Sequence, residues 1–165
     1  MELIVETSCI VTGDRVANTE RLKSVLEKQI INLYRNGVIH FWIGLQSKLD
    51  LLSAEILIDL RHELSELQLI IVQTGPMQYI GWPEYQIDRY AEILRAADDV
   101  ITLSRRTTQK HKKQQVWYLV DHAVKVLAVW DGISSCITGN IVEVAYRKKR
   151  QIFLIDTDNY CVRYL

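Results

Sequence analysis

The sequence predicts an α/β protein with a doubly wound, mostly parallel, three-layer sheet. Strand-like and helix-like segments alternate along the chain, and the helical segments are long enough to act as crossover connections. The apolar run at 69–72 shows no alternation, which is typical of a strand buried on both faces. Because no repeat, low-complexity segment or linker interrupts this pattern, we expect residues 1–165 to form a single domain.

Each expected element follows from its local pattern. The strands are short apolar runs, expected in the second half of 3–12 and at 39–43, 69–72, 99–103, 126–130 and 151–155, with 160–165 as an edge strand. The helices carry apolar residues every three to four positions and are expected at 18–36, 47–64, 83–97, 112–124 and 138–149. Asn18, Ser47 and Thr138 are expected to cap helices, and Pro83 is expected at a first helical position.

Composition narrows the classes of function. Twenty basic residues balance twenty acidic ones, so neither nucleic acid nor a membrane surface is expected as a partner. The longest apolar runs are about five residues, far below the length of a membrane span. The start Met1-Glu2 lacks a secretory signal, and three widely separated cysteines form no disulfide framework, so we expect a cytoplasmic protein. The four histidines lack metal-ligand spacing, and neither a metal nor a cofactor is expected.

The turn after the first strand is the first candidate for a ligand site. It reads Thr12-Gly13-Asp14-Arg15 and leads from a strand into a helix. Glycine lets backbone N–H groups approach an anion, the helix N-terminus favours negative charge, and Arg15 offers a planar set of donors to phosphate. The alternative is that Gly13 serves only the geometry of the turn.

Other loops are expected to reach the same edge. The carboxyl ends of parallel strands meet at one crevice, which is where open α/β sheets bind ligands. The loops concerned are 44–47, 73–82, 104–106 and 131–138. This convergence predicts the place of a site but not its ligand.

Several side chains have two interpretations. Asp50 is either an acid or ribose ligand, or part of a capping box that begins at Ser47. Glu55 lies roughly 140° round the helix from Asp50, so the two are not expected to act as a pair. Trp82 is a candidate for stacking on a ligand ring, whereas Trp117 and Trp130 are expected in the core.

Two basic clusters, at 110–113 and 147–150, are expected to be solvated faces. If they share a surface, that surface could instead hold a polyanion. The choice between these interpretations depends on where the fold places the two clusters.

A set of short motifs follows in a fixed order and spacing between about residues 10 and 155. They are Thr12-Gly13-Asp14-Arg15, Gly44, Asp50, Ala54-Glu55, Gln78, Trp82, Tyr90, Ile93-Leu94, Ala97-Asp98, Tyr118-Leu119-Val120-Asp121, Asp131-Gly132, Thr138, Asn140 and Ala145. In this order and spacing the chain resembles the YpsA-like family of the SLOG superfamily, which contains Rossmann-like proteins related to the DNA-processing protein DprA and to the cytokinin-activating LOG enzymes. The resemblance implies that residues 1–165 form a single Rossmann-like SLOG domain.

The chain departs from the family pattern at its glycine loops. Where the family has glycines after the second strand, this chain has Leu45, Gln46 and Lys48 around the retained Gly44. Cys136-Ile137 replaces a Gly-Gly pair, and Gln115-Val116 replaces an Arg-Asn pair. Each lost glycine adds a Cβ where backbone would approach a phosphate, and the lost arginine removes a phosphate ligand.

The resemblance implies a role in sensing or processing nucleotide signals, and our leading hypothesis is a non-catalytic or weakly catalytic protein that binds a nucleotide or nucleotide-derived small molecule in the crevice. The site residues it implies are Thr12, Gly13, Arg15, Gly44, Asp50, Gln78, Trp82, Asp131, Gly132, Thr138 and Asn140. One alternative is a degenerate scaffold that acts through a protein partner or as a homo-oligomer. A further alternative is a LOG-like hydrolase of nucleotide N-glycosidic bonds, with Glu55 as the candidate catalytic acid or base.

Overall fold

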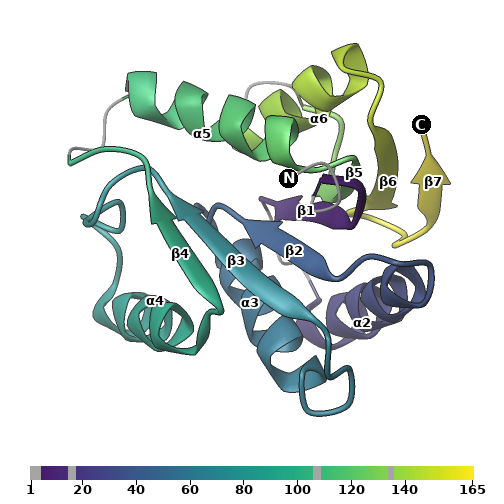
Figure 1. Ribbon diagram of the computed structural model, residues 1–165, viewed down its shortest axis with the longest axis horizontal. Coiled ribbons are helices and arrows are strands. Elements are labelled where there is room, and N and C mark those ends of the chain that lie inside the picture. The colour runs from purple at the N-terminus through teal and green to yellow at the C-terminus, as the bar shows by residue number, and fades with distance from the viewer. Residues whose placement is uncertain (1–4, 15–17, 106–108, 134–135) are drawn as a thin grey trace.

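A seven-stranded sheet runs through the centre of the protein (Figure 1). The computed structural model describes residues 5–14, 18–105, 109–133 and 136–165. In spatial order the strands are β4 (Asp99–Thr102), β3 (Gln68–Gln73), β2 (His40–Ile43), β1 (Ser8–Gly13), β5 (Lys125–Trp130), β6 (Gln151–Asp156) and β7 (Val162–Tyr164). All neighbouring pairs are parallel except β6 and β7, which are antiparallel.

The helices cover both faces of this sheet. One face carries α2 (Thr19–Arg35), α3 (Lys48–Leu60) and α4 (Glu84–Ala96), and the other carries α5 (Gln109–His122) and α6 (Ile137–Arg147) (Figure 1). The chain moves outward from β1 to β4, then crosses the sheet and continues from β5. The strand order therefore reverses between β1 and β5, which confirms the doubly wound, three-layer prediction.

Alternating strand residues build two separate cores. Cys9 and Val11 of β1 pack with α2, α3 and α4, whereas Ile10 between them packs with α5 and α6. Successive side chains of a strand point to opposite faces, so a strand covered on both sides must be apolar throughout. This is why the run at 69–72 shows no alternation.

Most element boundaries agree with the sequence prediction, and a few differ. Asn18 and Ser47 cap α2 and α3 as expected, by accepting hydrogen bonds from backbone N–H groups three residues on. The expected cap at Thr138 is wrong, because Cys136 caps α6 and Thr138 lies inside the helix, buried. Pro83 is the residue before α4 rather than its first residue. Helix α3 ends at Leu60, four residues earlier than expected.

None of the described helices combines the length and apolar character that crossing a membrane requires.

Candidate functional site

A hydrogen bond between two threonines marks the point where the strand order reverses. Thr12 at the end of β1 and Thr138 in the first turn of α6 are 126 residues apart, and their Oγ1 atoms lie 2.8 Å apart. Thr12 is 3% exposed and Thr138 is 1% exposed. The turn after β1 and the N-terminus of α6 are therefore held side by side at the carboxyl edge of the sheet.

Two carboxylates, Asp14 and Asp131, act on the Cys136 thiol at the start of α6, close to where the β1 turn meets this helix. The Sγ of Cys136 caps α6 by accepting the N–H of Gly139 at 3.2 Å. The pKa of the Cys136 thiol is raised, first by burial and then by its hydrogen bond to Asp14, with a further contribution from the charge of Asp131. A phosphate bound here would need a cation nearby. The cation predicted from sequence, Arg15, lies outside the described residues.

Asp50 ties together the loops that follow β1 and β2. Its Oδ2 accepts the backbone N–H of Gln46 at 2.8 Å, and its own N–H donates to Oγ of Ser47 at 3.1 Å. The Ser47 hydroxyl in turn donates to the carbonyl of Gly13. This arrangement resembles the expected capping box, but the carboxyl group reaches Gln46 rather than the backbone of Ser47.

The Asp50 carboxyl group is 4% exposed, and its Oδ1 has no hydrogen-bond partner among the residues that the structure describes. The pKa of this carboxyl group is raised to about 7, chiefly because burial disfavours its charged form; the nearby charge of Asp14 contributes to the rise, and the N–H of Gln46 opposes it. Perturbed carboxyl groups of this kind are concentrated in functional sites, although buried structural ones also occur.

Three glutamine side chains, which we call the glutamine cluster, meet at the carboxyl ends of β2 and β3. They are Gln46, Gln78 and Gln115. The amide of Gln115 donates to the carbonyls of Gly44 at 3.0 Å and Val72 at 2.7 Å. The amide of Gln46 donates to Oε1 of Gln115 at 3.2 Å.

Gln78 completes the glutamine cluster from the loop after β3. Its amide donates to the carbonyls of Gly44 and Leu45, both at 2.9 Å. Its Oε1 accepts the N–H of Thr74 at 2.8 Å. The cluster therefore satisfies buried backbone groups that would otherwise be costly to leave unpaired.

Trp82, the other aromatic ligand candidate, also makes protein contacts. Its ring packs edge-on against Tyr90 of α4, with centroids 5.8 Å apart. Gln78 and Trp82 are thus both engaged in holding the 73–82 loop in place. The prediction that they contact a ligand stays untested.

Leu45 follows Gly44 in the loop after β2. Its φ of 52° lies in the left-handed region that favours glycine, yet its side chain is fully buried in the core with α2, α3 and α4. The burial of a leucine side chain compensates for a backbone cost of about 1 kcal/mol. Lys48, by contrast, is exposed on the first turn of α3.

We expect Gly13→Ala to lower the free energy of unfolding by about 1–3 kcal/mol, because a Cβ at this position would overlap with Cδ2 of Leu49. Leu49 is fully buried and has little room to move. Urea denaturation measures the effect. The Gly13→Ala, Leu49→Ala double variant should lose less free energy of unfolding than the sum of the losses in the two single variants. Strictly additive losses would contradict the overlap.

The candidate catalytic residue Glu55 faces a different part of the molecule. Its carboxylate forms an ion pair with Arg89 of α4. The two side chains line a groove of about 410 Å³ between α3 and α4, together with Asp59, Asp88 and Glu92. In the described part of the chain, no three histidine, cysteine or acidic residues are placed to hold a metal ion.

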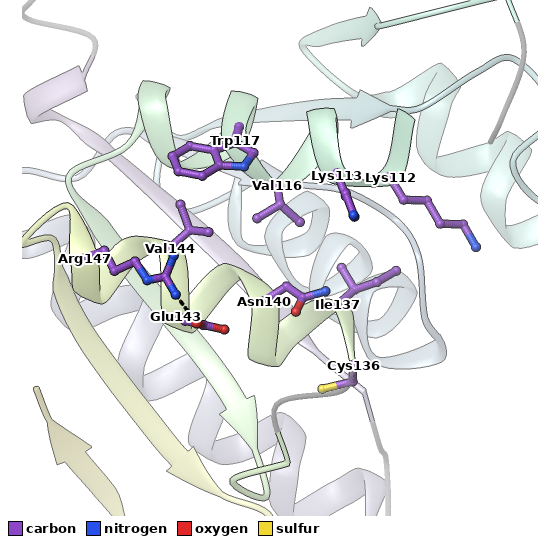
Figure 2. Close-up of a pocket in the computed structure, with 10 residues that line it drawn as sticks. All are labelled: Lys112, Lys113, Val116, Trp117, Cys136, Ile137, Asn140, Glu143, Val144 and Arg147. Atoms are coloured by element: carbon purple, nitrogen blue, oxygen red, sulfur yellow. Dashed lines mark hydrogen bonds and ion pairs between the residues drawn. The ribbon is translucent and has the colours of Figure 1, made fainter. Parts of the chain in front are cut away.

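A second groove, between α5 and α6, brings the two basic clusters to one surface, because Lys112, Lys113 and Arg147 all line it. It is also lined by Asn140, which the family resemblance placed among the ligand-binding residues. Its volume is about 660 Å³, and Figure 2 shows Lys113, Trp117, Asn140 and Arg147 along its walls. The expectation that Trp117 lies in the core is wrong, because its side chain is 45% exposed. The available signal was the helical spacing of Lys113 and Trp117, which places both on one face.

The fold, the reversal of strand order and the loops gathered at one edge define the class: a Rossmann-like α/β protein. The family model described as YspA SLOG family (YpsA) matches residues 9–160. The chain therefore belongs to the YpsA family of SLOG proteins, as its ordered motifs predicted.

Relatives of this chain come from bacilli. UPF0398 protein BH1768 of Halalkalibacterium halodurans is 29% identical over 134 residues, which cover 79% of this chain and 70% of that protein. A UPF0398 protein of Bacillus thuringiensis is 25% identical over 131 residues, covering 78% and 71%. UPF0398 protein BCAH187_A1726 of Bacillus cereus has the same identity and coverage. These names state no activity, so function must be argued from the site.

Proposed function

We propose that this protein binds a nucleotide or nucleotide-derived small molecule at the carboxyl edge of its sheet, without catalysing a reaction on it. The observation that carries the proposal is the hydrogen bond between Thr12 and Thr138. It holds the glycine turn after β1 beside the N-terminus of α6, so backbone donors from two elements can serve one anionic group.

The charges around this point favour a ligand with both hydroxyl and phosphate groups. Asp14 and Asp131 can accept hydrogen bonds from ribose hydroxyls. Their negative charge must be offset where a phosphate binds, and Arg15 follows Asp14 directly in the chain. The glutamine cluster closes the β2 and β3 side, so the ligand would lie on the side of β1 and β5.

We expect Arg15→Ala to weaken nucleotide binding by roughly 10- to 100-fold, because a charge-assisted hydrogen bond to phosphate is lost. Isothermal titration with a panel of nucleoside mono-, di- and triphosphates measures this. Arg35→Ala, at the exposed end of α2, is the matched control and should leave the affinity unchanged. The proposal fails if the unmodified protein binds no nucleotide, or if Arg15→Ala binds as tightly.

A second candidate function is that of a scaffold for a protein partner. Leu45 and Gln46 favour it, because they place side chains where the resemblance to the family implies glycines, and both are engaged with the protein itself. The surface beside this edge also exposes Met77, Ile80 and Tyr85. Mass photometry with chemical crosslinking in the native host tests the idea. A monomer that crosslinks to nothing would count against it.

A further inference from the structure

The groove between α5 and α6 combines an aromatic face with a positively charged end. Trp117 is 45% exposed, whereas the next residue, Tyr118, packs against the core. Lys112 and Lys113 precede it by about one helical turn on the same helix. Figure 2 shows Lys113 from α5 and Asn140 from α6 pointing toward the same space from opposite walls.

Charge is distributed unevenly along this groove. At one end Arg147 pairs with Glu143 at 2.6 Å, which leaves little net charge there. Lys148 lies over the Trp117 ring, 5.2 Å from its centroid, and also pairs with Asp121. The lysine end adjoins the first turn of α6, where helix N–H groups add to the attraction for an anion. The positive potential is therefore concentrated at Lys112 and Lys113.

The spacing of these groups matches a small ligand that has both a ring and a phosphate. Four residues separate Lys113 from Trp117, a rise of about 6 Å along the helix axis. A planar ring on Trp117 would place a phosphate, joined to it through one sugar, near Lys113. The amide of Asn140 faces the same space from α6, where it can donate to or accept from a sugar hydroxyl (Figure 2). A volume of about 660 Å³ falls in the range of small-molecule sites.

We propose that the α5–α6 groove binds a nucleoside phosphate, with its base on Trp117 and its phosphate at Lys112 and Lys113. The groove meets the carboxyl edge of the sheet at the N-terminus of α6, where Cys136 and Ile137 line it. The ligand contacts proposed here, Trp117, Lys112 and Lys113, are not used in the proposed function, so the proposal does not depend on ligand binding at that edge. The positive charge is confined to Lys112 and Lys113, which suits the phosphate of a single nucleotide better than the many phosphates of a nucleic acid strand. The zero net charge of the chain favours the same choice.

Fluorescence titration of the full chain tests the proposal. Adenosine monophosphate should quench the emission of the unmodified protein, and the quench should be lost in Trp117→Phe while binding by calorimetry persists. Adenosine, which lacks the phosphate, and inorganic phosphate, which lacks the base, should each bind at least tenfold more weakly. If adenosine or inorganic phosphate bound nearly as tightly as adenosine monophosphate, the assignment would be overturned.

Reversing the charge of Lys113 tests whether the ligand binds in the α5–α6 groove. Lys113→Glu should weaken adenosine monophosphate binding by at least tenfold. Lys28→Glu, an exposed position on α2 across the sheet, is the matched control and should have no effect. Far-ultraviolet circular dichroism verifies that both variants are folded. Unchanged binding by Lys113→Glu would overturn the proposal, as would tighter binding of a single-stranded oligonucleotide than of the mononucleotide.

Arg15→Ala separates this proposal from the proposed function. If the ligand occupies the groove, Lys113→Glu weakens binding and Arg15→Ala does not. If the ligand occupies the carboxyl-edge crevice, the pattern is reversed, and the groove assignment fails while the proposed function stands.

Discussion

Gln115→Ala is expected to lower the free energy of unfolding by about 2–4 kcal/mol. The side chain is fully buried, and its amide donates to the carbonyls of Gly44 and Val72. Its removal takes a donor from two buried carbonyls, leaves a small cavity and deprives Gln46 of an acceptor. Urea denaturation followed by circular dichroism measures the loss.

Gln114→Ala is the matched control, because Gln114 is exposed on the same helix, and its effect should be within about 0.5 kcal/mol of zero. A sharper test uses Gly44, where an added Cβ would lie 2.9 Å from Nε2 of Gln115. Gly44→Ala should therefore destabilise the unmodified protein but cost about 1 kcal/mol less in the Gln115→Ala background. Additive effects of the two substitutions would show that the packing of Gln115 on Gly44 is not the reason for the glycine.

Asp50→Asn is expected to remove a pH dependence from the stability of the protein. The folded-state pKa of about 7 lies above the ordinary value of 3.8, so the folded state binds the proton more tightly. This stabilisation is fully present below pH 3.8 and is lost as the pH rises through 7. Between pH 5 and pH 8 the unmodified protein should lose about 2–3 kcal/mol from this group, equivalent to roughly 5–10 °C in melting temperature.

The difference between Asp50→Asn and the unmodified protein isolates the contribution of Asp50. His40 titrates in the same range, and burial lowers its pKa, so its contribution to stability rises with pH, opposite to that of Asp50. Both proteins retain His40, and its effect cancels in the comparison. Thermal melts at pH 5, 6, 7 and 8 give the result. Parallel pH profiles for the two proteins would mean that the Asp50 carboxyl is ionised throughout this range.

Much of the fold was predictable because the signals for it are local. The caps at Asn18 and Ser47 depend on side chains that bond three residues away. The failure at Thr138 shows the limit of such reasoning. A hydroxyl near the start of a helix fits a cap, but Thr12 from a distant strand provides a buried partner, and a thiol two residues earlier takes the capping role.

The edge of the sheet at which the loops gather was predictable, but the contacts made there were not. The expected strand order located the carboxyl edge, and the departures from the family pattern drew attention to Leu45, Gln46 and Gln115. The glutamine side chains bind the protein rather than face outward because the fold brings the carbonyls of Gly44, Leu45 and Val72 within their reach. These carbonyls and the glutamines lie far apart in the chain, so sequence could not show it. In the same way, Trp117 was assigned to the core because its helical face does not reveal whether a neighbouring helix covers it.

Sequence by itself determined the three-layer architecture, the family and the edge at which loops converge, because apolar periodicity and ordered motifs are properties of the chain. Tertiary structure alone decided that Thr12 bonds to Thr138, that Gln115 fills the space over Gly44 and that Trp117 borders a groove with Lys113. These outcomes depend on distances of a few ångströms between residues far apart in the chain, and such distances are set only when the layers pack.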